Sequence, residues 1–210
     1  MYEKILIAMQ KYIILKTPWK TMKKNSLEIM SILHNSRIRI IGKENTLEIK
    51  KGNCKRIKIG IDGNNNSIFI EEDVYIRNLE IIIQGNNHIV HISKKVEIGG
   101  ASIVCCGENS KVYLGEDCLL ASNINIKSCD GHSVYQNGVV INNSQEVYIG
   151  QNVWIAQDVN ILKGAKIGNN SVVGINSLVT SNNFPSNVII GGVPAKIIKH
   201  NITWGKEGTV

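Results

Sequence analysis

The second half of the chain repeats aliphatic residues at a spacing of six, and no other feature limits the fold as strongly. One register consists of Ile149, Ile155, Ile161, Ile167, Val173 and Val179. A second register lies between those positions and consists of Val153, Val159, Ala165, Ser171 and Ser177. A period of six fits neither a 3.6-residue helix nor a strand that alternates every second residue. It is typical of short parallel strands that each end in a turn and stack coil upon coil.

The residues between the aliphatic positions support the same interpretation. Glycine or alanine often follows an aliphatic residue, and segments such as "IDGNNN" and "IIIQGNN" recur where the chain has to turn. Glycine and asparagine tolerate the positive φ that tight corners require. The same pattern is present upstream in a less regular form. We therefore predict an all-β fold in which residues 37–193 form one parallel β-helix solenoid.

The two ends of the chain depart from the repeat. Residues 1–36 are predicted as a small helical or irregular cap, and residues 194–210 as a short tail. One helical face of the cap would consist of Ile5, Met9, Tyr12, Ile13 and Leu15, and a second short helix would begin at Ser26 in "SLEIMSIL". Residues 1–39 hold eight Lys and Arg against two Glu, a net charge of +6. The cap either packs on the first coil or a neighbouring subunit, or residues 1–24 contact an anionic membrane surface.

Charge and cysteine content exclude some classes of function. Nearly all of the net charge of +7 lies before residue 40, which argues against nucleic-acid binding by the solenoid. No apolar run approaches the roughly 18 residues of a membrane span. Five cysteines without a C-x-x-C pair favour reduced thiols, and we expect Cys105 and Cys106 to line the interior. The predicted location is therefore the cytoplasm, at the periphery of the inner membrane if residues 1–24 contact it.

One segment interrupts the repeat. Between Ile126 and Ile149 the sequence "KSCDGHSVYQNGVVINNSQEVY" is irregular, and we predict a loop over about residues 127–146. Long loops in compact folds are often functional. This loop contains the only Asp-x-His of the chain, Asp130 and His132. A histidine titrates near neutrality and suits the general base of an acyl transfer, and either Asp130 or a backbone carbonyl would orient its ring. The neighbouring Cys129 has no evident activating partner, so we do not expect it to be a nucleophile.

The sequence between Ser128 and Trp204 resembles a known family. The segments "SCDGHSVY", "NVWIAQDVNILKGAKIG" and "IIGGVPAKIIKHNITW" are similar to the C-terminal half of hexapeptide-repeat sugar O-acetyltransferases. They are most similar to the members that are encoded with capsule and lipopolysaccharide genes, which include the polysialic acid O-acetyltransferases. The resemblance implies a left-handed β-helix, whereas parallel crossovers are right-handed as a rule. It also implies acetyl-CoA as the donor and a homotrimer with active sites between subunits.

The resemblance assigns roles to single residues as well. His132 takes the place of the family's loop base, and Trp154 in "NVWIA" that of a tryptophan beside the acceptor and the thioester. Contacts to the coenzyme are implied for Ala156, Gln157, Gly174, Ile175, Thr180, Lys196 and Lys199, the two lysines by charge pairing with phosphates. Contacts to the sugar are implied for Asn123, Asn125 and Tyr135. Many members have Lys-Asp after the turn threonine, whereas this chain has Ser181 and Asn182.

These features together predict an acetyl-CoA-dependent O-acetyltransferase that acts on a hydroxyl of a sugar or cell-surface polysaccharide by direct transfer. One alternative is an N-acetyltransferase of an amino sugar nucleotide or an antibiotic. Another is a non-catalytic scaffold, because a fold alone does not determine a function. His88 and His91 lack the third histidine that a zinc site of this kind needs, so no metal is predicted.

Overall fold

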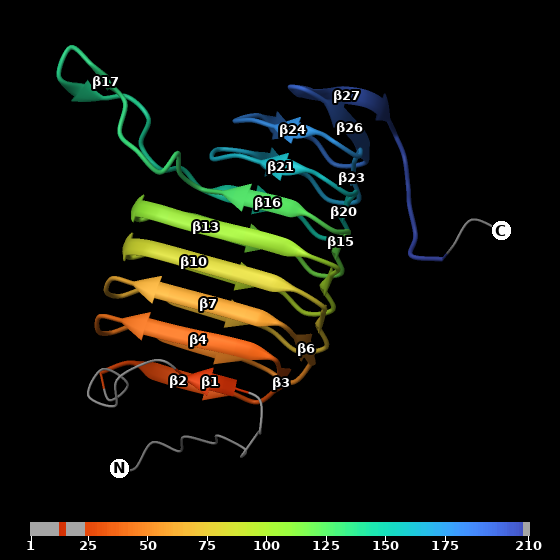
Figure 1. Cartoon of the computed structure of the whole chain (residues 1–210). Helices are drawn as coiled ribbons and strands as arrows, with labels where there is room; N and C mark the ends of the chain where they lie inside the picture. The colour runs from red at the N-terminus through yellow and green to blue at the C-terminus, as the bar shows by residue number, and fades with distance from the viewer. Residues whose placement is uncertain (1–12, 16–23, 208–210) are drawn as a thin grey trace.

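The computed structural model describes residues 24–207 and, for the backbone alone, residues 13–15. Every regular element among them is a β-strand, and three long sheets form the sides of a three-sided coil (Figure 1). In Figure 1 the chain climbs from bottom to top. In each coil it crosses the front from right to left along one sheet, which we call face 1, and returns behind along the other two sheets. This path is a left-handed parallel β-helix. No helix in the described part of the chain is long and apolar enough to cross a membrane.

The strands of each face recur once in every coil. Face 1 contains β1 (Ile13–Leu15), β4 (Ser36–Ile41), β7 (Ile57–Asp62), β10 (Leu79–Asn86), β13 (Ala101–Glu108), β16 (Ile124–Lys127), β21 (Asn160–Ile161) and β24 (Leu178–Val179). Face 2 contains β2 (Ser26–Ile29), β5 (Thr46–Ile49), β8 (Ser67–Ile70), β11 (Ile89–Ile92), β14 (Lys111–Leu114), β19 (Val147–Ile149), β22 (Lys166–Ile167) and β25 (Asn183–Phe184). Face 3 contains β3 (Ile32–His34), β6 (Asn53–Lys55), β9 (Tyr75–Ile76), β12 (Glu97–Ile98), β15 (Leu119–Leu120), β20 (Trp154–Ile155), β23 (Val172–Val173), β26 (Val188–Gly192) and β27 (Ala195–His200). Strands β17 (Tyr135–Gln136) and β18 (Val139–Val140) form a separate antiparallel hairpin. We name the corners 1–2, 2–3 and 3–1 after the faces that they join.

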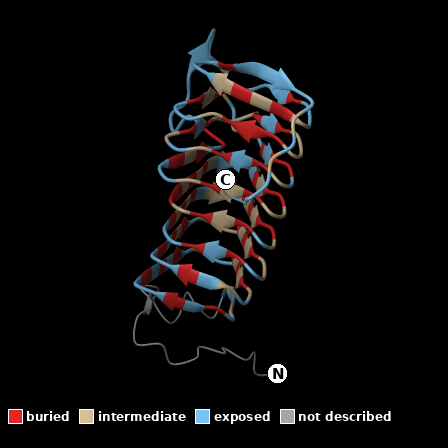
Figure 2. Cartoon of the chain, turned by 90° about the vertical axis from the view of Figure 1, so that its right-hand side faces the viewer, coloured by how far each residue is buried: buried red, intermediate tan, exposed pale blue. Residues whose placement is uncertain are grey.

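The interior of the coil is aliphatic, as the six-residue spacing predicted. Buried and exposed residues alternate along the strands, for example over β4, because successive side chains of a strand point to opposite sides (Figure 2). Every position of the two predicted registers is buried. Stacked from coil to coil, the aliphatic side chains form one continuous core.

The coils have two different lengths. In the lower part vertical neighbours such as Asn64 and Asn86 recur at a sequence spacing of 22, whereas in the upper part Asn152 and Asn170 recur at a spacing of 18. The shorter coil is three hexapeptides, one for each face. The longer coil has extended strands on face 1, where β10 and β13 each cover eight residues. The less regular pattern upstream is therefore a different repeat and not a degraded hexapeptide.

A buried ladder of polar side chains occupies corner 1–2 of the longer coils. Its members come from successive coils and are Asn45, Asn66, His88, Ser110 and Ser128. Asn66 Nδ2 donates to Asn45 Oδ1 at 3.0 Å, and the amide of His88 donates to Asn66 Oδ1 at 2.9 Å. The His88 ring and the Ser110 hydroxyl are hydrogen-bonded at 2.8 Å. Burial lowers the pKa of His88, so this histidine is a neutral part of the core.

The predicted helical cap is wrong where the structure describes it. The segment expected to begin a helix at Ser26 forms strands β2 and β3, and β1, which contains Ile13 and Leu15, pairs in parallel with β4. Exposure alternates along β2 and β3 with the period of two that a strand requires. The solenoid therefore begins before residue 37. Residues 1–12 and 16–23, with Ile5, Met9 and Tyr12, lie outside the described residues.

The upper end of the solenoid is closed by strands β26 and β27, which pair antiparallel. The following residues, 201–207, descend over face 3 instead of leaving the coil (Figures 1 and 2). The indole of Trp204 donates to the carbonyl of Asn152 at 2.8 Å. We call residues 201–207 the strap. The predicted tail is therefore packed against the solenoid, and the predicted boundary at residue 193 divides the closing hairpin.

Candidate functional site

The break in the repeat is a loop that projects from corner 1–2. Strand β16 ends at Lys127 and β19 begins at Val147, so vertical neighbours across the break, such as Asn123 and Asp158, are at a sequence spacing of 35. The inserted segment, residues 128–146, extends away from the coil and carries the β17–β18 hairpin (Figure 1). We call this segment the excursion.

Hydrogen bonds from Asn142 hold the backbone around His132. Asn142 Nδ2 donates to the carbonyl of His132 at 2.8 Å, and Asn142 Oδ1 accepts the amide hydrogen of Val134 at 2.7 Å. The same Nδ2 donates to Asp130 Oδ2 at 2.9 Å. His132 itself is exposed. The arrangement therefore fixes the backbone on both sides of an accessible imidazole.

Lys163 anchors this loop to the coil above. Its Nζ donates to Asp130 Oδ2 at 2.7 Å and to the carbonyl of Asn142 at 2.8 Å. The hydrogen bond from Lys163 lowers the pKa of Asp130, so the carboxylate is ionised near neutral pH. Asp130 was predicted to orient His132, but its carboxylate accepts hydrogen bonds from Lys163 and Asn142 and reaches His132 only through Asn142.

The sequence interpretation missed both Lys163 and Asn142. For Lys163 a signal was available in the register of the coils. Asn125 and Asn160 are vertical neighbours across the break, and Lys163 follows Ser128 at the same sequence spacing. Asn142 lies inside the excursion, where no register applies.

A disulfide is the second anchor of the excursion. Cys106 on β13 is bonded to Cys129, with the two Cα atoms 5.7 Å apart. The prediction of reduced thiols is therefore wrong for this pair, and so is the prediction that Cys105 and Cys106 both line the interior. Neighbours on a strand point to opposite sides, so only Cys105 is in the core. Cys54 and Cys118 are free and buried, and burial raises the pKa of Cys118 to about 12.

The hairpin at the far end of the excursion is apolar and exposed. Its accessible hydrophobic side chains are Val134, Tyr135, Val139 and Ile141. Exposed apolar groups that gather in one place mark a contact surface. The hairpin is therefore suited to packing against another molecule or another copy of this chain.

Trp154 lies on the opposite side of the coil from the excursion. It is partly exposed on β20 of face 3, with its ring centroid 6.0 Å from that of Trp204 in the strap. The excursion leaves from corner 1–2, and in a three-sided coil this corner is opposite face 3. A single chain therefore does not bring His132 and Trp154 together.

Several of the predicted binding residues gather at corner 3–1. Ala156 and Gln157 follow β20, and Gly174 and Ile175 follow β23 in the coil above. Asn123 occupies the same corner one coil lower and is hydrogen-bonded to the coil above it. The structure thus places these five residues in three successive coils at one corner.

The remaining predicted contacts lie elsewhere. Thr180 follows β24 at corner 1–2, on the side of the excursion. Lys196 and Lys199 are exposed on β27. Asn125 is on face 1 and Tyr135 is exposed on the hairpin. The predicted site residues are therefore distributed over several sides of one coil.

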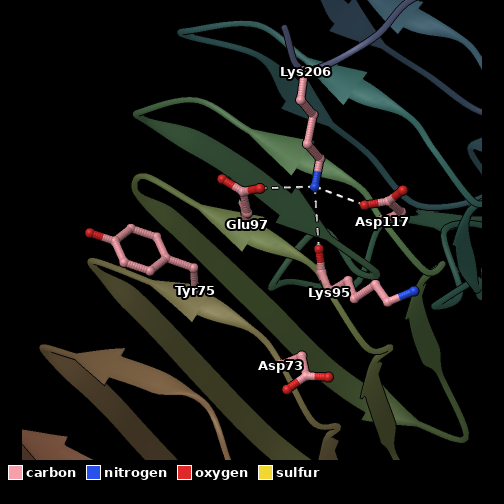
Figure 3. A pocket seen from close by; sticks show the side chains of 6 residues that line it. All are labelled: Asp73, Tyr75, Lys95, Glu97, Asp117 and Lys206. Atoms are coloured by element: carbon pink, nitrogen blue, oxygen red, sulfur yellow. Dashed lines mark hydrogen bonds and ion pairs between the residues drawn. The ribbon is translucent and has the colours of Figure 1, made fainter.

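A hollow of about 510 Å³ on face 3 contains none of these residues. It is lined by Asp73, Tyr75, Lys95, Glu97, Asp117 and Lys206 (Figure 3). Nζ of Lys206, which belongs to the strap, lies 2.9 Å from Glu97 and 2.8 Å from Asp117. The hollow is therefore the place where the strap docks. In residues 24–207 no group of three or more His, Cys, Asp or Glu is arranged to hold a metal ion.

Comparison with known proteins gives a consistent set of relatives. Residues 146–181 match the family described as bacterial transferase hexapeptide (six repeats). The polysialic acid O-acetyltransferase of Neisseria meningitidis is 34% identical over 186 residues, which are 87% of this chain and 85% of that protein. The crystal structure of the polysialic acid O-acetyltransferase OatWY has 32% identity and a TM-score of 0.82, and covers 94% of this chain and 92% of its own. The polysialic-acid-specific acetyltransferase NeuO has 27% identity and a TM-score of 0.59, over 90% of this chain and 85% of its own.

Proposed function

Because this chain belongs to the family of the bacterial polysialic acid O-acetyltransferases and is an O-acetyltransferase, we propose that it transfers acetyl from acetyl-CoA to a hydroxyl of a cell-surface polysaccharide of the capsule or lipopolysaccharide. The observation that carries the proposal is the backbone of the excursion, which Asn142 fixes on both sides of His132. A general base must be held within hydrogen-bond reach of its substrate, and a fixed but accessible imidazole meets that requirement.

In the proposed reaction His132 acts as the general base. Its imidazole removes the proton of the acceptor hydroxyl while the hydroxyl oxygen attacks the thioester carbonyl of acetyl-CoA. The tetrahedral intermediate then collapses, the carbon–sulfur bond breaks, and the CoA sulfur takes the proton from the imidazolium. The acetyl group passes directly to the sugar. The thiol nearest in sequence, Cys129, is bonded to Cys106 and has no part in the reaction.

We propose that the active site lies between two subunits of a homotrimer. His132 and Trp154 are on opposite sides of one coil, so they can share a site only if the excursion of one subunit crosses to face 3 of the next. The exposed apolar hairpin offers the contact surface that such a crossing needs. A closed ring of three copies repeats this contact at every interface.

The coenzyme and the sugar are proposed to lie along the upper coils. Ala156, Gln157, Gly174 and Ile175 at corner 3–1, with Thr180, would contact the pantetheine arm. Lys196 and Lys199 would pair with the phosphates, because an exposed ammonium group binds phosphate by charge. Asn123, Asn125 and Tyr135 are proposed for the sugar.

Replacement of the proposed base tests this function. His132→Ala should lower kcat by about 10²- to 10⁴-fold, the usual contribution of general base catalysis, without a change of fold. CoA release can be followed with a thiol reagent, and circular dichroism monitors the fold. His34→Ala, the same change at an exposed histidine on β3 of the lower coils, is the matched control and should keep full activity. Unchanged turnover of the His132 variant would contradict the mechanism.

The chemistry of the acetylated product separates the proposal from its alternatives. Mass spectrometry before and after mild base should detect an ester that is lost, as O-acetylation requires. An amide that survives the base would assign N-acetylation of an amino sugar nucleotide or an antibiotic instead. Absence of transfer from acetyl-CoA to any acceptor would favour the non-catalytic scaffold.

We also propose a cytoplasmic location, with residues 1–24 in contact with the inner membrane surface; the Cys106–Cys129 disulfide does not support this location, because disulfides are rare in cytosolic proteins. The support is the basic charge of residues 1–39. Deletion of residues 1–24 should release the protein from anionic vesicles and leave the trimer intact. Loss of the trimer would assign the segment to subunit packing instead.

A further inference from the structure

A column of aromatic rings runs along face 2, outside the site described above. It consists of Phe69, His91, Tyr113 and Tyr148, one from each successive coil and in register on β8, β11, β14 and β19. Neighbouring ring centroids are 6.0, 5.3 and 5.1 Å apart, and the two tyrosine rings are within 8° of parallel. The chain has only two Phe and six Tyr, so the presence of three of them in one column sets this face apart.

A hollow of about 310 Å³ lies beside the rings and is lined mainly by polar groups. Three rings of the column, those of His91, Tyr113 and Tyr148, contribute to its lining. The other lining residues are Glu71, Ser93, Lys94, Glu116, Gln151 and Asn169. They offer carboxylate, hydroxyl, amide and ammonium groups, which are both donors and acceptors. Ring hydrocarbon next to such groups suits a molecule that has C–H faces and many hydroxyls, and a sugar has both.

The column has a structural use, but that use does not explain all of it. Aromatic side chains that are neighbours across strands stabilise a sheet. A purely structural stack has no need for the 42% exposure of Tyr148 or for a polar hollow beside it. A protein-binding surface would show a continuous apolar patch, whereas the lining of this hollow includes charged side chains such as Glu71 and Glu116.

The upper end of the column, Tyr148, lies next to the end of the excursion. Tyr148 lies two residues after Glu146, the last residue of the excursion. The Tyr113–Tyr148 stack also joins the coil before the excursion to the coil after it. A chain molecule that lies along the column is therefore led to corner 1–2, from which the loop with His132 projects.

We propose that this column and its hollow bind an extended stretch of the polysaccharide acceptor, while a sugar further along the same polymer reaches His132. The inference rests on the proposed function, because it assumes a polymeric acceptor. Neighbouring strands are about 4.8 Å apart, so four rings span roughly 14 Å and contact several consecutive sugars. The rings pack against sugar C–H faces, and side chains such as Gln151 and Asn169 hydrogen-bond to the hydroxyls.

Tyr148→Ala tests the inference with polysialic acid, the acceptor named for the relatives, as a long polymer and as a trisaccharide. Loss of one ring contact should raise KM for the polymer about tenfold with kcat unchanged, and leave KM for the trisaccharide as it was. In affinity electrophoresis the wild type should be retarded by polysialic acid in the gel and the variant should not. Tyr75→Ala on face 3 is the matched control, because Tyr75 is also 42% exposed.

Three results would overturn the inference. They are equal retardation of wild type and variant, a wild type that is not retarded, and a variant whose altered oligomeric state shows face 2 to be a subunit contact. Tyr148→Leu keeps much of the buried volume and replaces the alanine variant if that variant does not fold. A wild type that is retarded but transfers no acetyl group overturns the proposed function alone. A wild type that acetylates the polymer without retardation overturns the binding column alone.

Discussion

The lower and upper coils of this solenoid share one core but are built from different repeats. The lower coils recur at sequence spacings of 20 to 23, with long strands on face 1 and a ladder of buried polar side chains at corner 1–2. The upper coils recur at a spacing of only 17 or 18 and have small buried residues such as Ala165 and Ser177 near their corners. The excursion lies at the junction of the two. Every predicted site residue lies at or above that junction. The proposed catalytic and coenzyme-binding residues therefore belong to the excursion and the short coils, and the long coils extend the solenoid below them.

The largest expected effect concerns the buried ladder, which distinguishes the long coils. Asn66→Ala leaves the amide of His88 and the carbonyl of Gly85 without their partner inside the core. We expect the free energy of unfolding to fall by about 3 kcal/mol, because each unpaired buried polar group costs roughly 1–3 kcal/mol. Urea denaturation followed by circular dichroism measures it.

The matched change in a short coil is Ser171→Ala. The hydroxyl of Ser171 accepts the amide hydrogen of Val188 at 3.3 Å and is within hydrogen-bond distance of the carbonyls of Asn169 and Pro185, so these partners are backbone atoms and not the side chains of a ladder. The expected loss is about 1 kcal/mol. Equal losses in the two variants would show that the two kinds of coil do not differ in this respect.

A smaller effect is expected for the anchor that joins the excursion to the short coils. Lys163→Ala removes three charge-assisted hydrogen bonds from the base of the loop, to Asp130, Asn142 and Asn143, and should lower kcat about tenfold, since such bonds contribute roughly 1.5–3 kcal/mol each and solvent replaces part of them. Initial rates against acceptor and acetyl-CoA concentration separate kcat from KM, and KM for acetyl-CoA should stay unchanged.

Lys166→Ala is the control for that variant. Lys166 is in the same coil and forms an ion pair with Glu146, but both side chains are about half exposed, so little should be lost. Lys163→Arg should recover part of the activity because it keeps the charge. If the two alanine variants lose kcat equally, the loop is not positioned by Lys163.

The smallest effect is the pH dependence of the same anchor. Because the pKa of Asp130 is lowered in the folded protein, its contribution is complete above the unfolded pKa of about 3.9 and is lost as pH falls through the folded pKa. Hydrogen exchange in residues 128–146 should therefore accelerate below about pH 4, beyond its intrinsic pH dependence. Asp130→Asn should abolish this acceleration of hydrogen exchange. If hydrogen exchange of these residues in the wild type instead accelerates between pH 5 and 7, a group other than Asp130 is responsible.

The sequence predicted the short coils well because the hexapeptide pattern is local. A branched aliphatic residue and a small residue at fixed spacing define both the interior and the turn, and every such position from Ile149 to Val179 is buried. The long coils were seen as irregular, although Asn45, Asn66, His88 and Ser110 mark their corners at spacings of 21 and 22. The segment after Ser26 predicts a helix but forms strands, because a few aliphatic residues fit a period of 3.6 as easily as a period of two.

The anchors of the excursion depended on contacts between coils, which local pattern does not contain. Cys106 and Cys129 are at a sequence separation of 23, which equals the register spacing between β13 and β16, so their pairing follows only when that spacing is known. Lys163 pairs with Asp130 although the excursion separates the two residues in the sequence. The interruption of the repeat was enough to predict that His132 lies in a loop. To predict the side chains that anchor this loop, the stacking of the coils would have to be known.

The strap changes the cooperativity expected of a solenoid. In a stack of coils each repeat contacts only its neighbours, so a terminal coil can fray without disturbing the middle. Here Trp204 is hydrogen-bonded to Asn152, and Lys206 forms ion pairs with Glu97 and Asp117. Glu97 and Asp117 lie several strands below the closing hairpin on face 3. The end of the chain thus ties the uppermost coils directly to the long ones. Fraying of the top must release these contacts in the middle, so the strap gives a one-dimensional stack part of the all-or-none unfolding of a globular domain.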